Sequence, residues 1–463
     1  MSDKNLRDDL FYEQKNGYDL IDTDERIAVE DYCEGYKAYL NVSRTEREAV
    51  KEAIALAQEH GFVPFEPGMD IQPGMKLYRS NRGKALLLAV VGKKSLSEGC
   101  HVAAAHVDAP RLDLKQLPLY EDSELAYFKT HYYGGIKKYQ WAAIPLELHG
   151  VVTLKSGENV DVVIGRDKDD PQLVITDLLP HLAADQMKKG ATEIIPGEKL
   201  NILIGSQPYD DEGKDRVKLA VMSILNDSYG ITEEDFLSAE LEIVPGFDVR
   251  DIGLDRSLIG GYGHDDRVCA YPALTSLFSL TVPEFTAVTL LADKEETGSE
   301  GNTGTQSEFF RYFIADLAAM YGEEPRHVLS RSMCLSADVN AALDPIYAGV
   351  MDARNAARIN HGAVLTKYTG GSAKGGTSDA SAELMGRFRR IMDENDVCWQ
   401  IGELGRVEAG GGGTVAKYIA NLDVETVDLG VPVLSMHAPF EIVSKLDVYQ
   451  AHKAFAALLS RKD

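Results

Sequence analysis

The chain has 463 residues and 44% of them are hydrophobic, so it is too long for one ordinary core and too apolar to be disordered. Lys and Arg together number 48 and Asp and Glu together number 73, which gives a formal net charge of −25. A field of this sign repels phosphate backbones and anionic lipid surfaces. We therefore expect two folded domains, and we expect neither nucleic acid nor a membrane as a partner.

The N-terminus and the cysteines predict a soluble, cytoplasmic protein. Residues 1–10 mix charges of both signs and contain no apolar core of a signal peptide. No run of about 18 apolar residues occurs in the chain. The five cysteines lie far apart and include no CxxC pair, which suits a reducing compartment better than a disulfide framework.

Two helices are predicted between residues 24 and 60, where charged and apolar residues alternate at helical period. The second opens with Thr45 and Glu48 at the spacing of a capping box and ends at Gly61.

A hairpin and a β-rich segment follow. Residues 76–79 and the apolar run 85–91 flank a turn at 81–83, which predicts a hairpin whose second strand is buried. The stretch 112–251 differs, because short strands alternate there with turn signals. These strands are predicted at residues 151–154, 160–164 and 240–244.

An α/β pattern resumes after residue 251. Its apolar runs lie at 287–292, 333–337 and 431–436, and its helical stretches at 268–280 and 448–459. We therefore predict an α/β fold with a mixed central sheet flanked by helices. Residues 1–111 and 252–463 would form this domain, split around an inserted β-rich domain of residues 112–251.

Potential metal ligands follow the apolar runs 102–105, 287–292, 333–337 and 431–436: His106, the acidic segment 293–296, Asp338 and His437. A fifth, Asp265, lies in a glycine turn ahead of a predicted helix. Ligands collect outside the carboxyl ends of strands in open α/β sheets, so these side chains are expected to converge in one crevice. Taken singly, each is more ordinary: a core histidine, a helix cap or a solvated acid. Their joint occurrence favours a metal site.

The number of candidate ligands suits two metal ions. Two histidines and three carboxylates, one of them bridging, give each ion three protein ligands and leave room for a shared water. The negative charge of three carboxylates and a hydroxide balances two divalent ions. Nitrogen and oxygen ligands without thiolates favour zinc, with cobalt or manganese as alternatives.

Two acidic positions have supporting roles. Asp108 shares a face with His106 in an extended segment, so it can orient the imidazole. Glu295 and Glu296 can address one centre only where the strand breaks into a loop, and Gly298 helps to supply that break. One glutamate would bind metal, and the other would accept the proton of the attacking water and pass it to the leaving amine.

Other motifs are less informative. Gly410 to Gly413 lack the lysine of a phosphate-binding loop and predict a tight turn. No HExxH motif and no nucleophile elbow support another class of hydrolase. The aromatic, glycine-rich segment 132–141 predicts either a packed bend in the inserted domain or a subunit contact.

Five segments together resemble the M18 family of metalloaminopeptidases, the aspartyl aminopeptidase family, and within it the bacterial aminopeptidase 1 branch. They are AHVDAP (105–110), GHDD (263–266), DKEETGSE (293–300), SAD (336–338) and SMHA (435–438). The resemblance covers nearly the whole chain. It implies a split α/β peptidase domain, an inserted dimerisation domain and a hollow dodecamer built from dimers.

The resemblance also implies how the site residues are used. It implies one zinc ion held by His106 and Asp338. It implies a second zinc ion held by Glu296 and His437, with Asp265 bridging the two ions.

Three further roles complete the prediction. The resemblance implies that Glu295 is the base, and it places His181 where the family's inserted domain sends a histidine into the neighbouring subunit's active site. Lys374, in a glycine-rich loop, could meet an acidic side chain at the first residue of the substrate or remain an exposed loop lysine.

The sequence thus predicts a dinuclear-zinc aminopeptidase that hydrolyses the first peptide bond of short peptides, with Glu295 activating the water. Two alternatives stay open. One is a dimetal deacylase acting on N-acyl amino acids, and the other is a metal-stabilised assembly or scaffold protein without catalysis.

Overall fold

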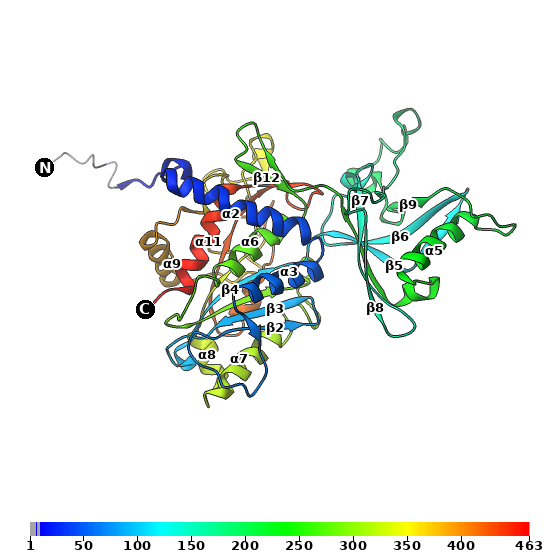
Figure 1. Cartoon of the computed structure of the whole chain (residues 1–463). Coiled ribbons are helices and arrows are strands. Elements are labelled where there is room, and N and C mark those ends of the chain that lie inside the picture. Colours follow the sequence, from blue (N-terminus) through cyan, green and yellow to red (C-terminus); the bar gives the residue numbers. More distant parts are fainter. Residues whose placement is uncertain (1–5, 7–9, 463) are drawn as a thin grey trace.

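The computed structural model describes Leu6 and residues 10–462 and shows a larger and a smaller lobe (Figure 1). Residues 1–10, on which the signal-peptide prediction rests, lie outside the described residues apart from Leu6 and Leu10. We define the smaller lobe as residues 111–245. Among the described residues, no helix combines the length and the apolar character that crossing a membrane requires.

Within residues 10–462, the larger lobe is built on a nine-stranded sheet of order β1-β2-β3-β13-β4-β14-β18-β16-β17. Strand β4 runs parallel to both of its neighbours, β13 and β14, whereas β3 runs antiparallel to β13. The strands are β1 (Val63–Pro64), β2 (Lys76–Asn81), β3 (Ala85–Val90), β4 (Cys100–His106), β13 (Thr286–Ala292), β14 (Met333–Ser336), β16 (Ala363–Thr366), β17 (Trp399–Ile401) and β18 (Glu425–Gly430).

Helices cover both faces of this sheet, which confirms the predicted fold class. Leu86 and Leu88 of β3 pack into one hydrophobic core, and Leu87 and Ala89 pack into the other. A strand buried on both faces is an unbroken apolar run, which is why it stands out in the sequence. The helices on the first core are α2 (Thr23–Val42), α3 (Glu46–Glu59), α6 (His264–Thr275), α9 (Ala382–Glu394) and α11 (Lys445–Leu459). Those on the second are α7 (Phe309–Met320), α8 (Pro325–Arg331) and α10 (Ala416–Ala420).

Several local predictions are confirmed. Helices α2 and α3 occupy the predicted stretch, and Thr45 and Glu48 form the expected capping box. Strands β2 and β3 form the hairpin, and Arg82 and Gly83 turn the chain with positive φ.

The helix predicted at 268–280 is wrong at both ends. It begins at His264 and ends at Thr275. The hydroxyls of Thr275 and Ser276 donate hydrogen bonds to backbone carbonyls of the preceding turn. Such local bonds compete with the helical ladder and favour its end.

The apolar run 431–436 was expected to be a strand of the same sheet as the other runs, and this is wrong. The central strand here is β18, which ends at Gly430, and Pro432 has no amide hydrogen to continue a ladder. The chain passes instead into a separate sheet of order β11-β12-β20-β19-β15. Its strands are β11 (Arg250–Ile252), β12 (Leu258–Gly261), β15 (Asn340–Ala341), β19 (Pro432–Leu434) and β20 (Glu441–Ser444).

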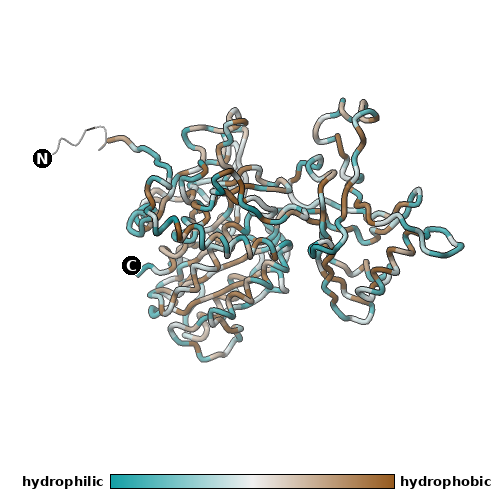
Figure 2. Tube along the Cα trace, turned by 45° about the horizontal axis from the view of Figure 1, so that its top comes forward, coloured by the Kyte–Doolittle hydropathy of each residue, from teal (hydrophilic) through white to brown (hydrophobic). Residues whose placement is uncertain are grey.

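The smaller lobe is an antiparallel sheet of order β8-β7-β10-β5-β6-β9, and the three predicted strands lie within it. The β-rich interpretation missed the helix α5 (Arg216–Tyr229), which packs on this sheet. Hydrophobic segments gather inside each lobe, so each lobe has a core of its own (Figure 2). The strands are β5 (Arg111–Asp122), β6 (Leu125–Tyr133), β7 (Leu146–Thr153), β8 (Asn159–Ile164), β9 (Ile202–Gly205) and β10 (Ala239–Pro245).

The remaining helices are short. They are α4 (Ala191–Ile194) and the 3-10 helices η1 (Gly17–Asp19), η2 (Leu96–Glu98), η3 (Lys138–Trp141), η4 (Pro180–Leu182), η5 (Gly197–Lys199), η6 (Glu233–Ser238), η7 (Glu295–Thr297) and η8 (Pro345–Val350).

Candidate metal centre

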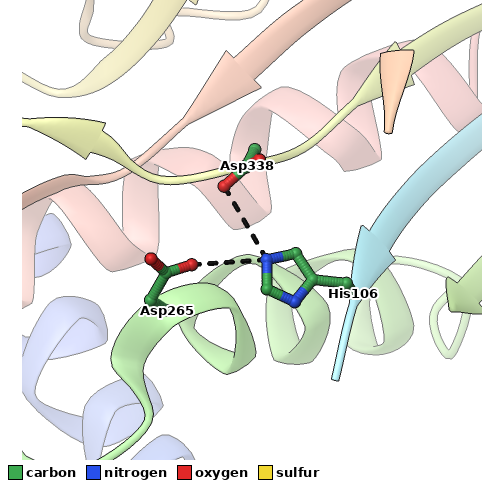
Figure 3. Close-up of side chains that lie close together, drawn as sticks. All are labelled: His106, Asp265 and Asp338. Carbon is green, nitrogen blue, oxygen red and sulfur yellow. Dashed lines mark ion pairs between the residues drawn. The ribbon is translucent and has the colours of Figure 1, made fainter. Parts of the chain in front are cut away.

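Three side chains meet where strands β4 and β14 end (Figure 3). His106 is the last residue of β4, and Asp338 follows β14 closely. Asp265 lies in the first turn of α6, where its backbone is non-helical. The Nε2 atom of His106 lies 3.3 Å from Asp265 Oδ1 and 3.8 Å from Asp338 Oδ1. We call these three residues the first group.

Asp265 also belongs to a second group, with Glu296 and His437. Glu296 lies in η7, the turn after β13, and His437 lies in the turn after β19. The Nε2 atom of His437 lies 3.1 Å from Asp265 Oδ2 and 3.4 Å from Glu296 Oε1. The two carboxylate oxygens of Asp265 therefore face different groups, and the five side chains predicted to meet do so.

The spacing of these atoms fits a metal ion in each group. A tetrahedral zinc ion with bonds of about 2.0–2.1 Å holds its ligand atoms about 3.3 Å apart. The atoms His106 Nε2, Asp265 Oδ1 and Glu296 Oε1 are buried and have no hydrogen-bonding partner. Buried polar atoms are almost always paired, so a cation bound between them satisfies atoms that are otherwise orphaned.

The charge of the centre points the same way. Burial raises the pKa of the Glu296 and Asp338 carboxyl groups, and the negative charge of Asp265 adds to this. Burial also opposes ionisation of Asp265, but the adjacent His106 and His437 rings outweigh it and hold the pKa of Asp265 below the usual range. Burial disfavours a charged His437 ring, yet the adjacent acids raise its pKa to about 10. The acids thus outnumber the positive charges, and divalent cations would restore the balance.

Glu295 lies beside the first group rather than within it. Its Oε2 atom is 3.9 Å from His106 Nε2. Burial and the charge of Asp338 raise the pKa of Glu295 to about 8, which suits a group that exchanges protons near neutral pH. The expected break after β13 is present, because Lys294 and Gly298 have φ of 67° and 98° on either side of η7. The break lets adjacent glutamates address one centre.

Asp108 organises the turn that carries both glutamates. Its Oδ1 atom accepts the Glu295 N–H at 3.1 Å, and its Oδ2 atom accepts the Glu296 N–H at 3.2 Å and the Tyr133 hydroxyl at 2.8 Å. Nδ1 of His106 lies 3.0 Å from the Asp108 carbonyl oxygen and 3.3 Å from its Oδ1. Asp108 therefore lies where it was expected beside the imidazole and also fixes the neighbouring turn.

Sequence reasoning missed two contacts that hold the second group. The buried carboxylate of Glu441 accepts the backbone N–H of His437 at 2.7 Å and that of Asp265 at 3.1 Å. The Gly135 carbonyl lies 2.7 Å from Nδ1 of His437, which leaves Nε2 free to face the acids. Segment 132–141 is thus neither only a packed bend nor only a subunit contact, because it reaches the centre from the smaller lobe.

The two predicted substrate-binding residues lie elsewhere. His181 is exposed on η4 in the smaller lobe, and none of the contacts among the described residues joins it to the centre of its own chain. Lys374 lies in an exposed loop, where its Nζ atom is 3.0 Å from Asp379 and 3.7 Å from the centre of the Tyr368 ring. It lines a small cavity of about 100 Å³ together with Arg406. The roles of His181 and Lys374 stay predictions.

A mixed sheet covered by helices, with histidine and carboxylate side chains that converge beside the ends of its strands β4, β13 and β14, is typical of an α/β metalloenzyme. The family model described as "Aminopeptidase I zinc metalloprotease (M18)" matches residues 39–459. The chain therefore belongs to the M18 family of zinc aminopeptidases and is a peptidase, which confirms the resemblance seen in the motifs.

Individual relatives agree. A "Probable M18 family aminopeptidase 1" from Clostridium acetobutylicum is 46% identical over 464 residues, covering 98% of this chain and 100% of the relative. The crystal structure of an M18 family aminopeptidase from Thermotoga maritima matches with a TM-score of 0.93 at 42% identity, over 97% of this chain and 100% of that one. A structure described as the mApe1 dodecamer of S. cerevisiae matches with a TM-score of 0.76 at 19% identity, over 92% and 96% of the two chains, which shows a shared fold alone.

Proposed function

We propose that the protein is a dinuclear-zinc aminopeptidase that removes the N-terminal residue from short peptides. The observation that carries this proposal is the sharing of Asp265 between two groups of potential ligands, with Glu295 beside them. His106 and Asp338 would hold one ion and Glu296 and His437 the other. Zinc is the expected metal, and cobalt or manganese would suit the same nitrogen and oxygen ligands.

Each residue has a distinct part in the proposed reaction. Two bound ions would supply Lewis-acid polarisation of the scissile carbonyl and a lower pKa for the attacking water. Glu295 takes the proton from that water and gives it to the leaving amine. The acids of the second group attract the free α-amino group of the substrate, which restricts cleavage to the N-terminus. Asp108 holds Glu295 in place through its backbone N–H.

The substitution Glu295→Gln tests the proposed base. Turnover of aminoacyl anilides should fall by about 10²- to 10⁴-fold, the usual range for a general base. Zinc content should stay at the wild-type level, because Glu295 is not a proposed ligand. Glu300→Gln, an exposed glutamate in the same loop, is the matched control. Activity of E295Q within tenfold of the wild type would contradict the role, and a panel of N-acylated substrates would expose a deacylase.

We also propose that the smaller lobe pairs subunits and that six such dimers form a dodecamer. The S. cerevisiae structure is described as a dodecamer. Exposed apolar side chains on this lobe support the proposal: Leu178, Leu179, Leu182, Met187 and Ile224. In that assembly His181 would reach the active site of a neighbouring subunit. Light scattering should then give the mass of twelve chains of 50.8 kDa.

The five cysteines are all free and buried, which fits the reducing cytoplasm.

A further inference from the structure

Glu441 is a buried carboxylate whose two oxygens serve two different residues of the candidate centre. Its side chain lies at the start of β20 with 2% exposure. One oxygen accepts the His437 N–H at 2.7 Å, and the other accepts the Asp265 N–H at 3.1 Å. Both residues belong to the second group, so a single side chain ties together two of its three members through their backbones.

Distant parts of the chain make this contact possible. Strand β20 pairs antiparallel with β12, and Glu441 stands opposite Gly261 in that register. The chain then passes through Gly263, whose φ is 77°, into the turn that carries Asp265. His437 itself has a φ of 63°, a left-handed conformation that costs energy for a residue with a Cβ. The hydrogen bond to Glu441 helps to hold the ring in the direction that this backbone sets.

Asp447 shows what the same chemistry does away from the centre. It is buried in α11, close to Glu441 in the sequence, and its two oxygens accept the N–H groups of Asn360 at 2.8 Å and Gly362 at 2.7 Å. Among the described residues, its hydrogen bonds join it to Asn360, Gly362 and Ser444, and none reaches the two groups. Asp447 therefore matches Glu441 in burial and in hydrogen bonding but not in what it holds.

We propose that Glu441 is a positioning residue for the metal centre: it sets the backbone of Asp265 and His437 so that both side chains converge on one ion. This inference rests on the proposed dinuclear function. A glutamine at 441 offers one acceptor oxygen and turns an amide N–H₂ toward a second backbone N–H, so one of the two bonds is lost. Because Asp265 is shared, the first ion should also be affected, but less than the second.

Zinc affinity is the direct readout. Metal-free full-length protein is titrated with zinc in competition with a chromophoric chelator. For Glu441→Gln we expect the affinity for the zinc ion of the second group to fall by about 10- to 100-fold, the usual effect of removing a group that orients ligands. Asp447→Asn should lower the zinc affinity by less than threefold. Glu441→Asp keeps the negative charge on a shorter side chain, so its zinc affinity should lie between those of E441Q and D447N. This variant replaces E441Q in the experiment if E441Q does not fold.

The outcomes separate this inference from the proposed function. If wild-type protein does not bind two zinc ions per chain, the dinuclear proposal fails. If the wild type binds two and E441Q binds both within threefold of its affinities, Glu441 is not a positioning residue. If D447N weakens zinc binding as much as E441Q does, the effect is general destabilisation and the inference is overturned.

Discussion

The two halves of the candidate centre are built in different ways. The first group is held by secondary structure: His106 ends β4 and Asp338 follows β14, its parallel neighbour. The second group is held by turns: Glu296 lies in η7, and His437 has a left-handed backbone. The His106 side chain is 1% exposed, whereas that of His437 is 34% exposed.

This difference shows which metal-binding side chains are positioned by their own strand and which need hydrogen bonds from other segments. Sheet register alone sets the spacing of residues at the ends of parallel strands. Turn residues have no ladder to fix them, and here Asp108, Glu441 and Gly135 supply hydrogen bonds instead. The first group should therefore be rigid and closed. The second should be adjustable and open to the amine of a substrate.

Replacing the residue that both halves share should have the largest effect. We expect Asp265→Asn to lose zinc from both groups and activity by about 10³-fold or more, because each metal contributes several kcal/mol to stabilisation of the transition state. Asp338→Asn should lose zinc from the first group only. Zinc per chain is measured by atomic emission on desalted protein, and a D265N variant that keeps two ions would contradict the shared role.

Removal of metal by a chelator should reveal the difference in exposure. Dipicolinate should strip zinc in two phases, with the ion of the second group, whose His437 side chain is 34% exposed, leaving at least about tenfold faster, equivalent to ~1.4 kcal/mol in barrier. His437→Ala should abolish the fast phase and leave one slowly released ion per chain. His327→Ala, at an exposed histidine outside the centre, is the control. A single phase of zinc release from the wild type, or a fast phase that survives in H437A, would show that the halves do not differ.

Acid can both unfold the protein and release its metal. His452 lies outside the two groups, so it predicts a loss of folding stability at low pH that can be measured on metal-free protein. Burial lowers the pKa of His452 to about 4. At pH 5 the unfolded chain therefore protonates this histidine and the folded chain does not, so stability falls as the pH drops from about 6.5 toward 4, by about 2 kcal/mol at pH 5. The ring packs 4.7 Å from Tyr32 and lies 3.0 Å from the Thr275 hydroxyl.

The substitution His452→Gln should remove most of that pH dependence. Urea unfolding of metal-free protein at pH 7 and pH 5 measures it, with His327→Gln as the control. An H452Q variant whose stability falls between these pH values as much as the wild type would refute the assignment.

Much of the first group could be predicted from the sequence, because its signals are local. The apolar runs 102–105 and 333–335 are buried throughout, and such runs mark buried strands. A ligand after each run then follows from the rule for parallel sheets. The break at Gly298 was equally visible, since glycine adopts its φ of 98° without strain.

The supports of the second group could not be predicted, because they depend on pairings between distant segments. Glu441 is one of 73 acids, and only the β12–β20 register brings it to Asp265. The Gly135 contact depends on how the smaller lobe sits beside the turn of His437. The sequence places the strand before His437 in the wrong sheet for the same reason. That strand, β19, pairs with Asn340 and Ala341 of β15, which are distant in the chain.

Anomalous X-ray diffraction at the zinc edge, on crystals of zinc-loaded protein, tests the central claim most directly. We expect two zinc ions per chain, each bound to a different oxygen of Asp265, with His106 on one ion and His437 on the other. A single ion, or two ions that do not share Asp265, would contradict the account.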